Sequence, residues 1–127
     1  MSDLQPVVGA AVSSPVMPYS QGMVTDDLVF PAGQIGVDTD GQLAGAGVYE
    51  QTTQALANLR AVLEAAGSSL ARVVKVNGYL TNDSFWSDYN RAYVEAFGDH
   101  RPARTTVGVA FLAKGALVEI EAIALKG

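Results

Sequence analysis

The chain has 127 residues, of which 49% are apolar and 17% are charged, a composition typical of one globular domain spanning residues 1–127. Thirteen acidic against eight basic side chains give a net charge of −5, which disfavours the phosphate backbone of a nucleic acid as a partner. The absence of cysteine excludes disulfides and thiolate metal sites, and a single histidine cannot build an ordinary zinc site.

The N-terminal segment has the least regular pattern. Its first fifteen or so residues are rich in proline, serine and alanine, and residues 1–12 are predicted to form an irregular arm with one short strand. The segment lacks a basic stretch followed by a long apolar run, so no signal peptide is expected. Nowhere do 18 apolar residues follow one another, which argues against a membrane span. We therefore expect a cytoplasmic protein without a membrane partner.

Strand patterns dominate residues 22–45. Turn signals at residues 25–27 and 38–41 bound short apolar runs, and these runs predict two short strands. The period then changes. From Val48 to Ala66 apolar residues recur every three or four positions, which predicts an amphipathic helix, and Gly67 is a natural stop for it.

Residues 71–82 alternate as in a strand. A second helix is predicted from Asp83, a suitable N-cap, to Phe97. Its aromatic residues fall on one broad face, which favours core or subunit packing over a cofactor site. Two final strands are predicted at residues 104–111 and 116–125. The strand predicted at residues 71–82 is expected to direct Val74, Val76, Gly78 and Leu80 to one face, and Val73, Lys75, Asn77 and Tyr79 to the other.

The order of these elements predicts an α+β fold, in which two helices cover one face of a mixed sheet. The opposite face of the sheet then has no helix left to cover it. Together with the low content of charged residues, this uncovered face predicts that the chain associates with copies of itself.

Two carboxylates mark the last strand. Alternation places Glu119 and Glu121 on the same face, about 7 Å apart, opposite a set of small apolar residues. One interpretation is a solvated or ion-paired strand face, with Lys75 as an ordinary partner. The other is a cleft at an interface opposite Arg104, where a carboxylate could position a water or shuttle a proton.

Arg104 begins the preceding strand. Its planar guanidinium can hold a carboxylate through two parallel hydrogen bonds, which a lysine cannot imitate. An ion pair with Glu119 or Glu121 is the structural alternative. Arg101 precedes a proline in a loop, where we expect it to be solvent-exposed.

Five segments together resemble the Rid family, also called YjgF or L-PSP. The similarity runs in one register from about residue 12 to the C-terminus, so it covers most of the chain. The segments are "PYSQG" (18–22), "AGQIGVD" (32–38), "QTTQALANLRAVLEAAGSSLARVVKVNGYLTN" (51–82), "YNRAYVEAF" (89–97) and "PARTTVGVAFLAKGALVEIEAIA" (102–124).

The resemblance implies a chorismate-mutase-like fold assembled as a homotrimer, with a barrel-like core of sheets and clefts between adjacent subunits. It also implies an activity. Rid proteins of the RidA type hydrolyse reactive 2-imino or 2-enamino acids, such as 2-iminobutanoate and 2-iminopropanoate, to 2-keto acids and ammonia. They need no cofactor.

Matching positions carry the family's site residues onto this chain. Arg104 matches the arginine that binds the substrate carboxylate, Glu119 the glutamate that places the attacking water, and Tyr19 the tyrosine that enters the cleft from a neighbouring chain. Further ligand positions match Gly33, Asn90, Thr106 and Ala32. Three residues depart from the RidA pattern: Ala32 replaces a serine, Thr106 a cysteine and Ala113 a proline.

Two other functions stay open from the sequence. The same clefts could bind a carboxylate ligand or a protein without catalysis. Family members have also been described as endoribonucleases or translation inhibitors, but the acidic charge and the lack of a basic patch disfavour that activity here.

Overall fold

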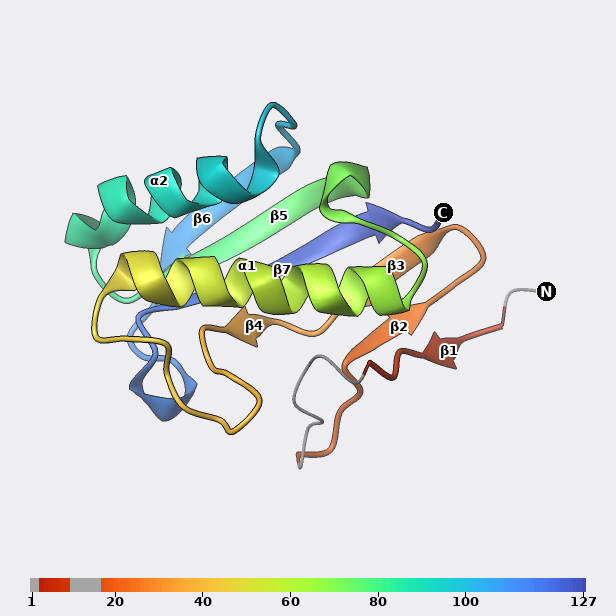
Figure 1. The fold of residues 1–127 in the computed structure, drawn as a ribbon, viewed down its shortest axis with the longest axis horizontal. Coiled ribbons are helices and arrows are strands. Elements are labelled where there is room, and N and C mark those ends of the chain that lie inside the picture. Colours follow the sequence, from red (N-terminus) through yellow and green to blue (C-terminus); the bar gives the residue numbers. More distant parts are fainter. Residues whose placement is uncertain (1–2, 10–16) are drawn as a thin grey trace.

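The computed structural model describes residues 3–9 and 17–127, and these residues form a mixed β-sheet with two α-helices on one face (Figure 1). The α+β class predicted from the sequence is confirmed. Neither helix has the length and apolar content needed to cross a bilayer. The elements are β1 (Gln5–Pro6), β2 (Gly22–Val24), β3 (Leu28–Pro31), β4 (Gln34–Ile35), α1 (Val48–Ala65), β5 (Val73–Leu80), α2 (Trp86–Phe97), β6 (Ala103–Gly108) and β7 (Val118–Leu125).

The sheet has the strand order β1-β2-β3-β7-β5-β6, and β4 pairs separately with β7. β5 and β6 are parallel because α2 carries the chain back between them, whereas the other pairs are antiparallel. β6 is the last strand in this order and lies at one edge of the sheet. Of the arm predicted over residues 1–12, residues 3–9 contain the short strand β1, and residues 1–2 and 10–12 lie outside the described part.

Helix α1 confirms the predicted periodicity. It ends one residue earlier than expected, at Ala65, and Gly67 adopts a left-handed φ of 82° just beyond it. Its buried face packs on the sheet and includes Val48, Ala55, Leu56, Leu59, Val62 and Leu63.

Helix α2 begins differently from the prediction. A 3₁₀ turn over Asp83–Phe85 precedes it, and the capping residue is Asn82 rather than Asp83. Asn82 has an extended backbone, from which its side-chain oxygen accepts a hydrogen bond from the Ser84 N–H at 2.8 Å. The helix buries Tyr89, Ala92, Tyr93 and Phe97, and Gly98 ends it with a φ of 62°.

The alternation predicted for β5 holds from Lys75 onward and is wrong at its start. Val73 is 3% exposed, whereas Val74 is 48% exposed, the reverse of the expected faces. The pairing of β5 with β7 shifts register between Val73 and Lys75, which is a β-bulge. An extra residue in one strand moves the preceding side chains to the other face, and a period of two cannot show this in advance.

The last two strands are shorter than predicted. β6 ends at Gly108 instead of residue 111, and β7 starts at Val118 instead of 116. A 3₁₀ turn at Ala113–Gly115 lies between them, with Lys114 in a left-handed conformation. The faces of β7 are as predicted, because Val118, Ile120, Ala122 and Ala124 are buried under the helices.

The opposite face of the sheet has no helix against it (Figure 1). It carries Glu119 and Glu121, together with exposed apolar side chains from three strands. Phe30 is 39%, Val107 45% and Leu125 39% exposed. The uncovered face expected from the order of the elements is therefore present.

Candidate active site

The predicted site residues fall into two groups on opposite faces of the sheet. Arg104 aligns with Val76 of β5, which is buried beneath the helices, so its side chain lies on the helical face. Glu119 aligns with Tyr79, on the uncovered face. Since strand neighbours in register share a face, one chain cannot bring these two side chains together. We call Arg104, Asn90 and Thr106 the arginine group, and Glu119, Gly33 and Ala32 the glutamate group.

Helix α2 holds the guanidinium of the arginine group. Arg104 Nη1 donates a hydrogen bond to Asn90 Oδ1 at 2.8 Å. Neither glutamate pairs with this arginine, so the structural alternative of an ion pair within the chain is not realised. Its Cζ atom lies 4.8, 5.2 and 5.8 Å from the ring centroids of Tyr93, Tyr89 and Trp86. Three rings thus flank the cation on its helical side.

We call the rings of Trp86, Tyr89 and Tyr93 the aromatic cage, and its two phenols stay neutral at ordinary pH. Burial raises the pKa of Tyr93 to about 12 and also raises the pKa of Tyr89. Neither phenol therefore becomes an anion that would compete with a ligand carboxylate for Arg104. The guanidinium is only partly buried, and it has donors beyond the one that Asn90 accepts.

Thr106 is held against the same helix. Its Oγ1 lies 3.4 Å from the hydroxyl of Tyr89, a distance at which either group can donate. This contact depends on Gly78 of the neighbouring strand, because a Cβ at that position would overlap the Tyr89 hydroxyl. A glycine in mid-strand weakens a sheet, so its presence here has a packing reason.

Glu119 forms the glutamate group with the segment that leads into β4. Ile35 aligns with Glu119, and the chain passes so closely that a Cβ at Gly33 would overlap the carboxylate. Ala32 donates its N–H to Gln21 O at 2.8 Å, which anchors this segment. Burial raises the pKa of Glu119, and the nearby charge of Glu121 raises it further.

Glu121 has structural partners instead. It accepts hydrogen bonds from the Tyr79 hydroxyl at 2.5 Å and from Asn77 Nδ2 at 3.5 Å. The bond to Glu121 raises the pKa of Tyr79 to about 12. The ion pair suggested for Lys75 with Glu119 or Glu121 is not formed; its ammonium donates instead to Thr105 Oγ1 at 2.8 Å.

Two further predicted residues lie at the surface. Tyr19 is 59% exposed on a segment before β2, and its contact with a neighbouring chain stays a prediction. Arg101 is exposed in its loop, as predicted, and donates to the carbonyl groups of Gly98 and His100.

Sequence reasoning missed the role of the α2 aromatic residues at the arginine. It assigned Trp86, Tyr89 and Tyr93 to packing, and the latter two are indeed buried. Their spacing on one helix face, beside a strand that begins with an arginine, was the available signal. No cluster of three metal-ligating side chains occurs within residues 3–9 and 17–127.

The sequence of the chain is similar to that of a known protein family. Residues 10–126 match the sequence model of a family described as "Endoribonuclease L-PSP". The chain belongs to this family. It is the Rid family that the five segments resemble, so that resemblance is confirmed.

Individual Rid-family relatives cover nearly the whole chain. A RutC family protein of Pyrococcus horikoshii is 44% identical over 88% of this chain and 90% of its own length. The human 2-iminobutanoate/2-iminopropanoate deaminase is 40% identical over 87% of this chain and 81% of its own. The structure of E. coli TdcF with bound serine has a TM-score of 0.91 and 31% identity, with 97% of this chain and 99% of that chain covered. The Rid fold and family are therefore shown, and the relatives carry several functional names.

Proposed function

We propose that the protein hydrolyses 2-imino acids, or their enamine tautomers, to 2-keto acids and ammonia in clefts between subunits of a homotrimer. One observation carries the proposal. The arginine group and the glutamate group have complementary chemistry, a cation with free donors and a desolvated carboxylate, yet lie on opposite faces of one sheet. A second copy of the chain can bring them together.

The surface of the chain supports such an assembly. β6 lies at the edge of the sheet, and the uncovered face exposes Phe30, Val107 and Leu125. Apolar side chains on an uncovered sheet face favour burial against another subunit. A closed ring in which each chain presents its arginine group to the glutamate group of the next makes every cleft equivalent. This is the trimer that the family resemblance implies, with Tyr19 entering from the neighbouring chain.

The proposed mechanism begins with binding. Arg104 holds the substrate carboxylate through its fork of donors, while Asn90 and the aromatic cage fix the guanidinium. Thr106 and the backbone at Gly33 border the ligand. Ala32 lacks the hydroxyl of the serine common in RidA proteins, so one polar contact to the ligand is missing here.

Hydrolysis then needs only water and proton transfers. Glu119 of the neighbouring chain holds a water against the C=N carbon and removes a proton as the C–O bond forms, which gives a carbinolamine. The proton moves to nitrogen, the C–N bond breaks, and the C=O bond forms. The balance is R–C(=NH)–COO⁻ plus water to R–CO–COO⁻ plus ammonia. A carboxyl with a raised pKa suits both steps, since it accepts and returns a proton more readily near neutral pH.

The test is to follow imine loss directly. 2-Iminobutanoate and 2-iminopropanoate are generated in situ, and their disappearance is measured with and without the protein. Free imines already hydrolyse in water, so the spontaneous rate is the control, and heat-denatured protein provides a second control. We expect acceleration in proportion to protein concentration. No acceleration across imines with several different side chains would overturn the deaminase proposal.

A second candidate is carboxylate binding without catalysis. It is favoured by the serine bound in E. coli TdcF, since serine carries a carboxylate of the kind Arg104 can hold. Calorimetric titration with a 2-keto acid separates the two functions, because binding without any imine turnover would support the second. Endoribonuclease activity, which the family description names, is a poor fit to a net charge of −5.

A further inference from the structure

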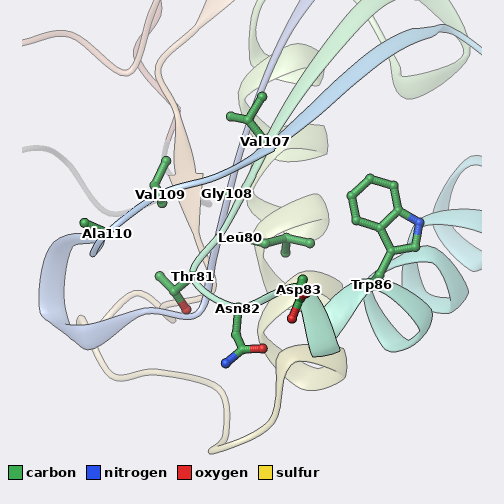
Figure 2. Close-up of a pocket in the computed structure, with 9 residues that line it drawn as sticks. All are labelled: Leu80, Thr81, Asn82, Asp83, Trp86, Val107, Gly108, Val109 and Ala110. Carbon is green, nitrogen blue, oxygen red and sulfur yellow. The ribbon is translucent and has the colours of Figure 1, made fainter.

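A pocket of about 250 Å³ opens between the start of α2 and the ends of β5 and β6 (Figure 2). It is too small for a drug-sized ligand, whose sites occupy about 300–1,000 Å³, but large enough for one part of a smaller molecule. Its walls are mostly apolar, with a short polar stretch at the start of α2. The lining residues are Leu80, Thr81, Asn82, Asp83, Trp86, Val107, Gly108, Val109 and Ala110.

Gly108 leaves this space empty. Alternation along β6 directs Arg104, Thr106 and position 108 to the helical face, where Gly108 aligns with Leu80. A Cβ built on Gly108 would meet nothing nearer than the carbonyl oxygen of Leu80, at 3.8 Å. A larger side chain at this position of the arginine-bearing strand would therefore extend from the pocket wall on the helical face.

Trp86 connects the pocket with the arginine group. Trp86 lines the pocket, and its ring centroid lies 5.8 Å from Arg104 Cζ, so Trp86 belongs to both the aromatic cage and the pocket wall. The strand rise separates the Cα atoms of Arg104 and Gly108 by about 13 Å. A ligand held by its carboxylate at Arg104 can therefore extend along β6 past Thr106 toward the open space.

We infer that this pocket is the side-chain subsite of the proposed deaminase, with Gly108 as the residue that sets the size limit. The inference rests on the proposed function and names its substrate class: 2-imino acids with bulky apolar side chains, branched aliphatic or aromatic, beyond the methyl and ethyl groups of 2-iminopropanoate and 2-iminobutanoate. Asp83 lines the pocket, so a substrate with a second carboxylate is disfavoured by like charge.

The test compares imines of graded size in variants of one position. Imines derived from alanine, leucine, phenylalanine and glutamate are generated in situ for the wild type and for Gly108→Ala and Gly108→Leu. Each added methylene in an apolar subsite changes kcat/KM by roughly ten-fold or more. We expect Gly108→Leu to lower the ratio of the phenylalanine-derived to the alanine-derived rate at least ten-fold. Gly108→Ala should lower it less, and the glutamate-derived imine should be the poorest wild-type substrate.

A control variant places a leucine side chain elsewhere. Ala57 lines a separate groove of about 240 Å³ between α1 and α2, so Ala57→Leu fills a pocket whose lining includes neither Arg104 nor Trp86. It should leave the ratio of the two rates at the wild-type value. Thermal unfolding of Gly108→Leu and Ala57→Leu checks that each variant keeps the fold. A ratio that stays constant across the Gly108 series would overturn the inference.

Failure of the proposed function is distinguishable from failure of the subsite. If wild-type protein accelerates no imine, the deaminase proposal fails, and titration with pyruvate and phenylpyruvate then tests the pocket by binding alone. Tighter binding of phenylpyruvate that Gly108→Leu reduces at least ten-fold supports the subsite. Equal effects of Gly108→Leu on both keto acids refute it.

Discussion

Arg104 is positioned by its neighbours more than by its own strand. Asn90 accepts one of its hydrogen bonds, and three aromatic rings of α2 flank its guanidinium. These contacts orient the guanidinium in advance, which would lower the entropic cost of binding the proposed ligand. The position of the Glu119 carboxylate, in contrast, depends on a missing side chain at Gly33. Burial raises the pKa of the Glu119 carboxyl group.

Substitutions of Arg104 should separate charge from geometry. Arg104→Ala removes two charge-assisted hydrogen bonds to the substrate, each about 1.5–3 kcal/mol, so kcat/KM for 2-iminopropanoate should fall roughly 10²–10⁴-fold. Arg104→Lys keeps the charge but loses the fork, and should fall in between. Steady-state kinetics measure both. Arg101→Ala, in the exposed loop, should retain wild-type kinetics, and undiminished activity of Arg104→Ala would refute the assigned site.

The pKa of Glu119 predicts how activity depends on pH. As pH falls, kcat/KM should drop when Glu119 becomes protonated. This drop should occur at a higher pH than for an ordinary carboxyl group, because burial and the charge of Glu121 both raise the pKa of Glu119. Glu121→Gln removes that charge and should move the drop to lower pH. Tyr79→Phe leaves the charge of Glu121 in place and is the control for the lost hydrogen bond. A drop that does not move in Glu121→Gln contradicts the coupling.

At the scale of elements, the parallel pair β5–β6 and its crossover α2 form one unit around the arginine. Thr106 of β6 and Tyr89 of α2 meet over Gly78 of β5. The cap at Asn82 starts the turn that leads into α2 and thereby places Trp86 beside the pocket. Packing between these elements therefore controls both the guanidinium and the space next to it.

Two glycines in this unit should respond differently to the same substitution. Gly78→Ala places a Cβ onto the Tyr89 hydroxyl and should lower the free energy of unfolding by about 1–3 kcal/mol. Gly108→Ala meets open space and should have little destabilising effect, or a slight stabilising one. Urea unfolding monitored by circular dichroism measures both. Tyr89→Phe should relieve part of the Gly78→Ala cost, and equal costs for the two glycines would show that the packing is misjudged.

At the scale of the whole molecule, the sheet divides the site. Its helical face carries the arginine group and its uncovered face the glutamate group, so in the proposed trimer each chain would hold halves of two different clefts. The same uncovered face exposes the apolar residues Phe30, Val107 and Leu125. Assembly would thus bury apolar surface and complete the site in one step, which makes activity dependent on the oligomer.

Mixing two inactive variants tests the divided site. Arg104→Ala chains keep Glu119, and Glu119→Gln chains keep Arg104. An intact cleft therefore forms wherever a Glu119→Gln chain presents its arginine group to the glutamate group of an Arg104→Ala chain. Random assembly of equal amounts, by co-expression or joint refolding, should restore about a quarter of the wild-type activity. Each variant alone should stay inactive, and size-exclusion chromatography with light scattering should show trimers. No recovery in mixed trimers would mean that both residues act from one chain.

Much of the architecture followed from the sequence. The three-and-four spacing after Val48, the stop at Gly67 and the alternation in β7 predicted α1 and the buried face of the last strand, because local period reports which side of an element faces the core. The bulge at Val74 and the cap at Asn82 were not predictable, since each depends on pairing or backbone geometry that neighbouring elements impose.

For the site, the sequence by itself determined the residue types, the family and the identities of Arg104 and Glu119 as a candidate pair. Only the tertiary structure decided that the two lie on opposite faces of one sheet, that three rings of α2 surround the arginine, and that an open pocket follows it at Gly108. The physical reason is that chemistry belongs to single residues, whereas faces, cages and empty volumes arise from strand register and packing between elements distant along the chain.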